Sequence, residues 1–388
     1  MAVLGIIAEY DPFHNGHLYH LRSAVSAAAP SAVIVALSGV FRQRGGPAVF
    51  SPFVRAECAL DAGADAVVSL PVLWTVRDAE HYALGAVFLL SSLGATHLAF
   101  GAENADLPLL QQTADLLEDQ PEPFRGMLRG LLAEGTGYPA ALARAAGSCI
   151  PECEALLNRP NNILAVCYLR AVRRLGVSLT PVIIPRIGSY HSECISPVSP
   201  SASAVCASLR RGAWQDALSA LPPFSQKAVR AAFLSGTTPD PKKLDAVLLA
   251  RLRSMTPGQA ALMPDCGEGL GAALLKASAA ASSREELISL LTTRRYSASR
   301  ISRLCTYALL GITGKRLSET ALPDSALLLA IRKNPSLTGP WKSGPVRVRP
   351  AAEWLEKADP ADAEAFRIWG MCSGLSGGFP CTERTVTR

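Results

Sequence analysis

The sequence predicts an α/β protein in which a parallel sheet flanked by helices is followed by a mostly helical region. Short, almost wholly apolar runs rich in β-branched residues alternate with helical stretches through residues 1–195, the pattern of a parallel sheet covered on both faces. From residue 196 the strand signal fades, and helical periodicity dominates to about residue 330. The length of 388 residues is enough for two or three domains. We therefore expect domains at residues 1–195 and 196–388.

The first domain is expected to contain five short strands, each buried on both faces, at residues 3–8, 32–37, 66–70, 97–100 and 179–184. The spacing of apolar residues predicts helices at residues 16–28, 51–62, 78–93, 107–118, 123–133 and 162–175. Ser51 followed by Pro52 is typical of a helix start, with an N-cap serine and proline at the first helical position. Residues 104–147 are expected to form a helical insertion between the fourth and fifth strands.

The second domain is expected to follow a proline- and serine-rich break at residues 196–203 and to be mostly helical and basic. Its last forty residues are rich in glycine and proline and are expected to be irregular in part. Two glycine-rich stretches indicate no chemistry. GLSGG at residues 374–378 lacks the preceding strand of a serine nucleophile elbow, and GEGLG at 267–271 has its third glycine too early for a dinucleotide fingerprint.

Composition excludes several classes of protein. Hydrophobic residues make up 49% and charged residues 18% of the chain, which argues against long disordered regions. Glu9 and Asp11 interrupt the apolar run at the start, so neither a signal peptide nor a membrane span is predicted there. Ten cysteines without any C-x-x-C pair indicate neither a disulfide framework nor a zinc site. We expect a soluble protein with free thiols in a reducing cytoplasm.

The net charge of +6 conceals an uneven distribution. Residues 294–349 hold eleven Lys and Arg against two acidic residues, a local charge of +9, whereas the rest of the chain sums to −3. Such a field favours a polyanionic partner, because Lys and Arg release counterions from phosphates. A solvated basic face without a partner is the alternative.

The chemistry is indicated by residues 9–20, EYDPFHNGHLYH, which contain H-x-G-H where the first strand turns into the first helix. This spacing places His14 and His17 within one helical turn, near free backbone N–H groups and the positive end of the helix dipole. Two imidazoles there can stabilise negative charge as a nucleophile attacks an α-phosphate. Gly16 leaves room for a nucleotide to approach the backbone. Ordinary histidines on a helix face, or a chance metal site, are the alternatives.

The chain resembles the nucleotidyltransferases with an HxGH signature and, within them, the tRNA(Met) cytidine acetate ligase family. The similarity covers most of the chain in a fixed order of blocks: GIIAEYDPFHNGHLYHL, SGVFRQRGGPAVFSPFVRAECALDAGADAVVSLP, HLAFGAEN, RPNNILAVCYLRA, IPRIGSYHSE and RRYSASRISRL. The resemblance implies a Rossmann-like parallel-sheet nucleotidyltransferase domain followed by a mostly α-helical RNA-binding domain.

The resemblance also implies a reaction. Acetate would attack the α-phosphate of ATP, supplied with Mg²⁺, to give acetyl-adenylate, and the acetyl group would pass to N4 of the wobble cytidine of elongator tRNA(Met). His14 and His17 would be catalytic. The implied ATP site consists of Ile7, Ala8, Glu9, Tyr10, Asp11, Pro12, Phe13, His14, Asn15, Gly16, His17, Leu18, Tyr19, His20, Gly101, Asn161, Asn162 and Arg186.

Several of these residues have a structural alternative. Arg186 follows the apolar run of the fifth strand, so it would leave that strand at its carboxyl end, but a surface arginine would fit as well. Asn161 and Asn162 fit either the nucleotide or the cap of the helix that follows. Gly101 fits either close approach of a nucleotide or a tight turn.

The chain departs from the family pattern at three positions. Asp11 stands where asparagine is usual, which would place a carboxylate beside the phosphates unless it holds Mg²⁺. Pro52 replaces a lysine and Cys206 an arginine, although Arg210 and Arg211 lie one turn after Cys206. Two functions therefore stand beside the ligase: an adenylyltransferase acting on a small molecule, and an RNA-binding protein with a degenerate nucleotide pocket.

The basic stretch at residues 294–307 is the expected tRNA-binding element. Apolar residues at helical spacing place one face of a helix in the core, and arginines with a tyrosine fall on an adjoining face. Arginine forks suit phosphates, and a tyrosine ring can stack on an unpaired base. The expected tRNA-binding residues are Arg294, Arg295, Arg300, Arg303 and Tyr307. A solubilising face with one packed tyrosine is the alternative.

Overall fold

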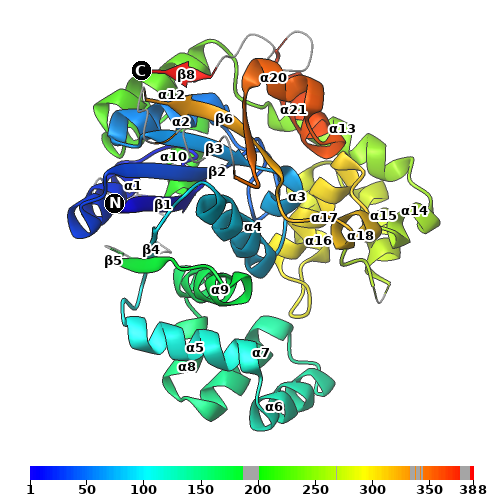
Figure 1. Cartoon of the computed structure of the whole chain (residues 1–388). Coiled ribbons are helices and arrows are strands. Elements are labelled where there is room, and N and C mark those ends of the chain that lie inside the picture. Colours follow the sequence, from blue (N-terminus) through cyan, green and yellow to red (C-terminus); the bar gives the residue numbers. More distant parts are fainter. Residues whose placement is uncertain (187–200, 268, 333–336, 338–340, 342–343, 376–384) are drawn as a thin grey trace.

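The computed structural model describes residues 1–186, 201–267, 269–332, 337, 341, 344–375 and 385–388. Its centre is one sheet with the strand order β5-β4-β1-β2-β3-β6-β7, and β8 pairs with β6 (Figure 1). The first five strands are parallel to one another. Their bounds are β1 Val3–Ala8, β2 Ala32–Ser38, β3 Ala66–Leu70, β4 His97–Ala102 and β5 Thr180–Pro185. The predicted parallel sheet is confirmed, and each expected strand lies within two residues of its observed position.

Helices cover both faces of this sheet. On one face the buried residues of β1 and β2 join a core with α1 and α2, and on the other they join a core with α4 and α9. The strands are almost wholly apolar because both faces are buried. The helices that connect the strands are α1 Asn15–Ala28, α2 Pro52–Ala62, α3 Val72–Thr75, α4 Ala79–Ser92 and α9 Pro160–Leu175. Ser51 caps α2 and Pro52 is its first residue, as the sequence predicts.

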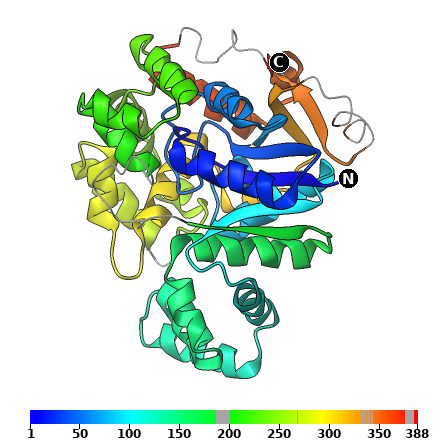
Figure 2. The same ribbon diagram turned by 90° about the vertical axis from the view of Figure 1, so that its left-hand side faces the viewer.

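The helical insertion is present between β4 and α9 and extends to residue 157, ten residues beyond the expected end. It projects from the α9 side of the sheet (Figures 1 and 2). Its helices are α5 Leu107–Asp119, α6 Glu122–Ala133, α7 Tyr138–Cys149 and α8 Glu152–Leu157.

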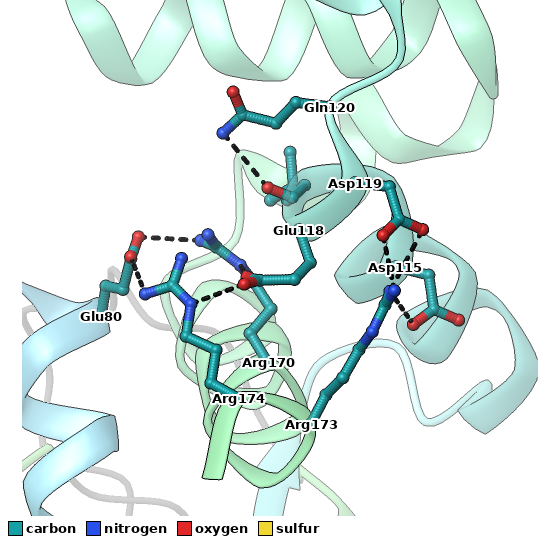
Figure 3. Close-up of polar contacts among 9 residues, drawn as sticks. Glu80, Asp115, Glu118, Asp119, Gln120, Arg170, Arg173 and Arg174 are labelled. Carbon is teal, nitrogen blue, oxygen red and sulfur yellow. Dashed lines mark hydrogen bonds and ion pairs between the residues drawn. The ribbon is translucent and has the colours of Figure 1, made fainter. Parts of the chain in front are cut away.

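A network of ion pairs fastens the insertion to the sheet domain (Figure 3). Arg170 of α9 is nearly buried and pairs with Glu80 of α4 at 2.9 Å and with Glu118 of α5 at 3.1 Å. Arg174 bridges the same two carboxylates, and Arg173 pairs with two acidic residues of α5. A network that includes buried groups resists breakage more than isolated surface pairs do. The insertion is therefore held in a fixed position on α4 and α9.

The region after residue 201 is helical, as expected, up to residue 318. Its helices are α10 Ala202–Arg210, α11 Trp214–Ser219, α12 Pro223–Leu234, α13 Pro241–Arg253, α14 Pro257–Ala261, α15 Leu270–Ala280, α16 Arg284–Leu291, α17 Ala298–Leu310 and α18 Gly314–Ser318. Buried residues of α13, α16 and α17 belong to the same core cluster as those of β1 and β2. These helices therefore pack directly on the sheet domain.

The C-terminal region returns to the sheet, which the sequence did not indicate. β6 pairs antiparallel with β3, and β7 and β8 pair with β6. The expectation that helical patterns continue to about residue 330 is wrong for β6, because this apolar run pairs with β3 as a strand of the sheet. The elements are β6 Ser325–Ile331, β7 Arg347–Pro350, α20 Ala351–Lys357, α21 Pro360–Cys372 and β8 Val386–Thr387. Within the described ranges, no helix is both long and apolar enough to cross a membrane.

Candidate active site

The turn between β1 and α1 fixes His14 and His17 against each other. His14 is the N-cap residue of α1: its Nδ1 accepts the backbone N–H of His17 at 3.3 Å, and Nδ1 of His17 accepts the backbone N–H of His14 at 3.3 Å. The rings are stacked, with centroids 3.6 Å apart and planes inclined by 14°. Because each Nδ1 is an acceptor, the proton of each neutral ring resides on Nε2. The turn therefore holds the Nε2–H groups of two adjacent rings side by side, and the His17 ring also hydrogen-bonds the Pro12 carbonyl.

Both rings are neutral at pH 7. Burial, followed by the nearby Arg186 charge, lowers the pKa of His14 to about 3. Burial and the neighbouring His14, His20 and Arg186 hold the pKa of His17 well below its ordinary value, and only the Pro12 carbonyl opposes this. A neutral imidazole still donates a hydrogen bond, and the donor becomes more effective as negative charge develops on its acceptor.

Gly16 lies against the ring of His14. A Cβ at Gly16 would lie 3.1 Å from Cε1 and 3.2 Å from Nδ1 of His14. At these distances the His14 ring would have to shift by a few tenths of an ångström. The glycine of H-x-G-H therefore leaves room for the stacked position of His14, in addition to any room it leaves for a ligand.

Arg186, Gly101 and His20 lie together at the carboxyl ends of β4 and β5. The Arg186 N–H donates to the Ala102 carbonyl at 3.0 Å, which extends the pairing of β5 with β4. A Cβ at Gly101 would lie 3.5 Å from Cγ of Arg186 and 3.7 Å from Cδ2 of His20. Since Arg186 also lowers the pKa of all three histidines of α1, its charge lies close to them. The predicted grouping of these residues at one edge of the sheet is observed.

His20 has a different hydrogen-bonding role. Its ring bonds the Phe100 carbonyl, and its Nε2 is buried with no partner among the described residues. The bond to Phe100 is thus made through Nδ1, which leaves a lone pair on the Nε2 of the neutral ring. Burial lowers the His20 pKa to about 4, so this ring also stays neutral. A buried acceptor without a donor needs a partner that the described residues do not supply, such as a water molecule or a ligand group.

Asn161 and Asn162 do not cap their own helix, since α9 begins at Pro160 and the cap is supplied by Glu103. The Glu103 carboxylate accepts the backbone N–H of Asn162 at 2.9 Å and the side-chain amide of Asn161 at 2.5 Å. The Asn162 amide is buried and fully engaged: its Oδ1 accepts the N–H groups of Glu103 and Asn104, and its Nδ2 donates to Leu156. Asn162 therefore joins the two ends of the insertion, and its amide is closed to a ligand.

The carboxylate of Asp11 is turned away from the site. It is buried and accepts the backbone N–H groups of Val49 and Phe50 at 2.9–3.0 Å, with Arg42 at 3.9 Å. The expectation of a carboxylate beside the phosphates is wrong, because Asp11 anchors the loop between β2 and α2. Cys206 is buried beside it, with Sγ 3.6 Å from the Asp11 carbonyl oxygen.

The remaining residues of the implied ATP site lie in different places. Some are at the end of β1, and others pack in the core. Ile7 and Ala8 end β1, and the Glu9 carboxylate accepts the Gln43 N–H at 2.7 Å. Tyr10, Phe13 and Leu18 pack in or against the core. Asn15 donates to carbonyl oxygens of residues 219 and 220, and Tyr19 is exposed. Pro12 is buried.

Sequence reasoning missed Arg55, a buried cation on α2. Its guanidinium donates to the carbonyl oxygens of Glu9 at 2.6 Å and Ser38 at 2.9 Å, and also to those of Gly39 and Phe50. These acceptors lie just after β1 and β2 and at the end of the β2–α2 loop. Arg55 therefore ties together the carboxyl ends of the two central strands. The only signal in the sequence was an arginine inside an apolar helix.

The basic residues around α17 are only partly exposed. Arg294 and Arg295 lie in the exposed loop before α17, whereas Arg300 donates to the Asp265 carbonyl at 2.8 Å and stacks over the Tyr296 ring at 5.0 Å. Arg303 is only 9% exposed, and its Nε has no acceptor among the described residues.

Tyr307 does not face solvent. It is 2% exposed, and its hydroxyl donates to the Val76 carbonyl at 2.7 Å. The expectation that this ring stacks on a base is wrong, because α17 is packed on several sides. The β2–α2 loop covers it through the Gly46 N–H, which donates to the Thr306 hydroxyl at 3.0 Å. Helical spacing could not reveal this contact across 260 residues.

Comparison with known proteins gives a consistent result. The family described as HIGH Nucleotidyl Transferase matches residues 1–336. A tRNA(Met) cytidine acetate ligase of Syntrophomonas wolfei is 37% identical over 321 residues, which cover 81% of this chain and 77% of that protein. The protein of the same name from Acetivibrio thermocellus is 35% identical over 338 residues, covering 84% and 81%.

Solved structures agree. The crystal structure of Thermotoga maritima TmcAL bound with alpha-thio ATP superimposes with a TM-score of 0.91 at 27% identity and covers 100% of this chain and 99% of that one. The apo form I of the same protein gives a TM-score of 0.93 with the same coverage. The likeness extends through the sheet, the insertion and the helical region alike.

Proposed function

Since this chain belongs to the HIGH nucleotidyl transferase family and, within it, to the tRNA(Met) cytidine acetate ligases, we propose that it activates acetate with ATP and acetylates tRNA. The first step forms acetyl-adenylate and pyrophosphate. The second transfers the acetyl group to N4 of the wobble cytidine of elongator tRNA(Met). ATP, acetate and tRNA are all cytoplasmic molecules, and we propose that the protein acts in the cytoplasm.

The stacked His14–His17 pair is the observation that supports this proposal most directly. In the first step an acetate oxygen bonds to the α-phosphorus, and the bond from that phosphorus to the bridging oxygen of pyrophosphate breaks. Acetate is already ionised, so no general base is needed. Negative charge grows on the phosphoryl oxygens, which the two Nε2–H donors and the Arg186 guanidinium can stabilise. In the second step the cytidine amine attacks the acetyl carbon, and AMP and a proton are released.

ATP is proposed to bind along the carboxyl ends of β1, β4 and β5. His14 and His17 would contact the α-phosphate region, and Arg186 the phosphates. The buried lone pair of His20 accepts hydrogen bonds, so it suits a hydroxyl or amino group of the nucleoside better than a phosphate oxygen. Of the asparagine pair, Asn161 is the one proposed to reach the nucleotide, because the Asn162 amide is fully engaged.

Mg²⁺ is proposed to enter with the triphosphate. Over the described ranges, no group of three or more His, Cys, Asp or Glu side chains could hold a metal ion, and the Asp11 carboxylate is committed to backbone N–H groups. The ion would therefore be coordinated mainly by phosphate oxygens and water, as is usual for Mg²⁺ bound with ATP.

The tRNA is proposed to bind the helical region, through Arg294, Arg295, Arg300 and Arg303. The local charge of +9 in residues 294–349 supports a polyanionic substrate over a small-molecule acceptor. We also propose that residues 1–195 perform the adenylation, although the common core couples them closely to the helical region.

Acetate-dependent exchange of labelled pyrophosphate into ATP tests the first half-reaction, and transfer of labelled acetate to a tRNA(Met) transcript tests the second. Exchange should require acetate and should proceed without tRNA. Exchange that requires another small acid or a phosphate ester would favour a small-molecule adenylyltransferase. Binding of tRNA without any exchange would indicate an RNA-binding protein with a degenerate pocket.

A further inference from the structure

The loop before α17 meets the helical insertion. A Cβ at Gly137, which precedes α7, would lie 2.6 Å from the carbonyl oxygen of Arg294. The backbones of residues 137 and 294 are therefore in direct contact, although they are far apart in the sequence. In Figure 1 the loop between α16 and α17 descends toward α7. The insertion and the helical region thus join at this point.

Tyr138 is the exposed aromatic residue at this junction, whereas Tyr296 of the loop is only partly exposed and lies under Arg300. Tyr138 is 55% exposed, one of the few large apolar side chains exposed to this degree. Its hydroxyl lies within electrostatic reach of Asp78, Glu80 and Arg170, which belong to the start of α4 and to α9. The ring therefore stands beside the space between the insertion, α4 and the loop of residues 292–297.

Two arginines of α17, Arg300 and Arg303, lie beside the same junction. Nε of Arg300 and Nε of Arg303 are buried and have no hydrogen-bond partner among the described residues, and Arg303 is more than nine-tenths buried. Of the acidic groups nearby, Glu80 pairs with Arg170 at 2.9 Å, whereas Asp78 contacts His81 at 2.7 Å and also interacts electrostatically with Arg303. The Asp265 carboxylate is the other acidic group near this site, and Arg300 bonds its backbone carbonyl. Arg294, Arg295, Arg300 and Arg303 outnumber Asp78 and Asp265 here, so the junction carries a net positive charge.

We propose that Tyr138, the loop of residues 292–297, Arg300 and Arg303 form one surface, here called the arch surface, that binds an unpaired stretch of RNA. Tyr138 stacks on one base, and phosphate oxygens of the same stretch bind the accessible guanidinium groups of this surface. The proposal rests on the proposed function, since it assigns the anticodon loop of the tRNA substrate to this surface. The insertion is then part of the RNA-binding surface. The exposed Tyr138, and not the buried Tyr307, provides the ring that stacks on a base.

Unpaired RNA fits this surface better than a duplex. An A-form helix buries its base faces and offers only phosphates, hydroxyls and base edges, so an exposed tyrosine would have nothing to stack on. In a single-stranded loop the bases are free, and stacking on an aromatic ring contributes about 1–3 kcal/mol per base.

The arch surface is connected to the histidine site through one chain of hydrogen bonds. The Gln43 N–H donates to the Glu9 carboxylate at 2.7 Å, and the Gln43 side chain donates to the Arg77 carbonyl at 2.7 Å. Glu9 follows β1 and precedes the histidine turn, while Arg77 immediately precedes Asp78 at the arch. Both sites therefore lie along the carboxyl edge of the sheet, where one bound RNA loop can extend from one to the other.

The test compares Tyr138→Ala, Tyr138→Phe and the matched control Met127→Ala in the full-length protein. Met127 is 45% exposed and lies on α6 of the same insertion. Affinity for a tRNA(Met) transcript is measured at fixed salt. Tyr138→Ala should weaken binding by about tenfold or more, whereas Tyr138→Phe and Met127→Ala should stay within twofold of wild type. Equal melting temperatures verify that the variants are folded.

Three results would overturn the proposal. The first is wild-type affinity in Tyr138→Ala. The second is an equal loss for an RNA duplex without a loop, which would show that the residue does not contact an unpaired base. The third is displacement of the tRNA by polyglutamate as effective as by an RNA oligomer of equal charge, which would assign the surface to an acidic protein. Failure of the proposed function is a separate result, because it appears as absence of acetate-dependent pyrophosphate exchange in the wild type.

Discussion

The β1–α1 turn and the arch surface offer two different kinds of donor to an anionic ligand. In the turn, His14 and His17 are neutral, stacked and fixed by each other's backbone. At the arch surface, the donors are permanently charged guanidinium groups, and Arg294 and Arg295 lie in an exposed loop. Neutral donors attract a distant anion weakly but are accurately aimed, whereas exposed cations attract at long range and are screened by salt.

This difference assigns each region a different task. A reaction that builds charge on one phosphorus benefits from donors that are already in place and need not reorganise. A large polyanion benefits from cations that release counterions along its length. Salt and charge reversal should therefore act mainly on the arch surface. Lower pH and the loss of an imidazole should act mainly on the turn.

Replacing His17 should give the largest effect. His17→Ala removes one Nε2–H donor and the ring that stacks on His14, so acetate-dependent pyrophosphate exchange should fall by about 10²–10³-fold or more. Affinity for tRNA should stay near wild type, because the imidazole is neutral and does not contribute to the cationic surface. The loss should be the same at low and high salt.

The matched control is His97→Ala. His97 begins β4, at the opposite edge of the sheet from the turn. Its replacement should leave exchange within a few-fold of wild type. If His97→Ala lost as much activity as His17→Ala, the effect would reflect general damage, and the catalytic assignment of the turn would be withdrawn.

Reversing two charges at the arch should give the next effect. Arg294→Glu combined with Arg295→Glu should weaken tRNA binding by tens of times at 0.1 M salt and reduce the slope of log affinity against log salt by about 2. Both side chains are exposed, so the fold should tolerate the change. Arg125→Glu combined with Arg129→Glu, on the exposed surface of α6, provides the same change of charge at another place. An equal loss in both double variants would show that only net charge matters.

Local patterns in the sequence predicted most of the sheet and the histidine turn, because the interactions that determine them span few residues. The strands follow from short apolar runs, and the His14–His17 pair follows from the start of a helix. Residues 325–331 were expected within a helical region, because the periodicity of a short apolar run does not distinguish a buried strand from a buried helix. Its place beside β3 depends on a pairing across more than 250 residues.

Side-chain exposure was the least predictable property. Asp11 appeared to be a ligand-facing carboxylate, but the N–H groups of Val49 and Phe50 hold it in the core. Tyr307 shares a helix face with two arginines, yet the loop from β2 covers α17. In both cases the decisive partner comes from a loop whose path the periodicity of residues does not predict.

Acid should destabilise the protein through the turn and not through the arch surface. Unfolded histidines titrate near pH 6.5, whereas the folded pKa is about 3 for His14 and about 4 for His20. Their stabilising effect is thus complete above pH 6.5 and is lost as the pH falls below it, because only the unfolded chain binds the protons. Between pH 7.5 and 5 the free energy of unfolding should fall by about 2 kcal/mol for each histidine.

The double variant His14→Asn with His20→Asn tests this effect, since asparagine is a good N-cap. Its free energy of unfolding, measured by urea titration at each pH, should depend less on pH than that of the wild type, by about two protons. The Arg294→Glu and Arg295→Glu variant should keep the wild-type dependence. If the histidine variant retained the wild-type slope, the rings would be protonated in the folded state, and their role as neutral donors would be incorrect.

The smallest effect should come from Tyr307→Phe, which separates a structural tyrosine from an RNA-binding one on the same helix. Loss of the hydroxyl leaves the buried Val76 carbonyl without its donor at 2.7 Å, so stability should fall by about 1–3 kcal/mol. Affinity for tRNA should not change, since the ring is buried. Tyr296→Phe is the matched control: its ring lies under Arg300, and its replacement should leave stability unaltered. A loss of tRNA affinity in Tyr307→Phe at wild-type stability would mean that α17 turns its tyrosine outward when RNA binds, and the contrast between the buried Tyr307 and the exposed Tyr138 would no longer hold.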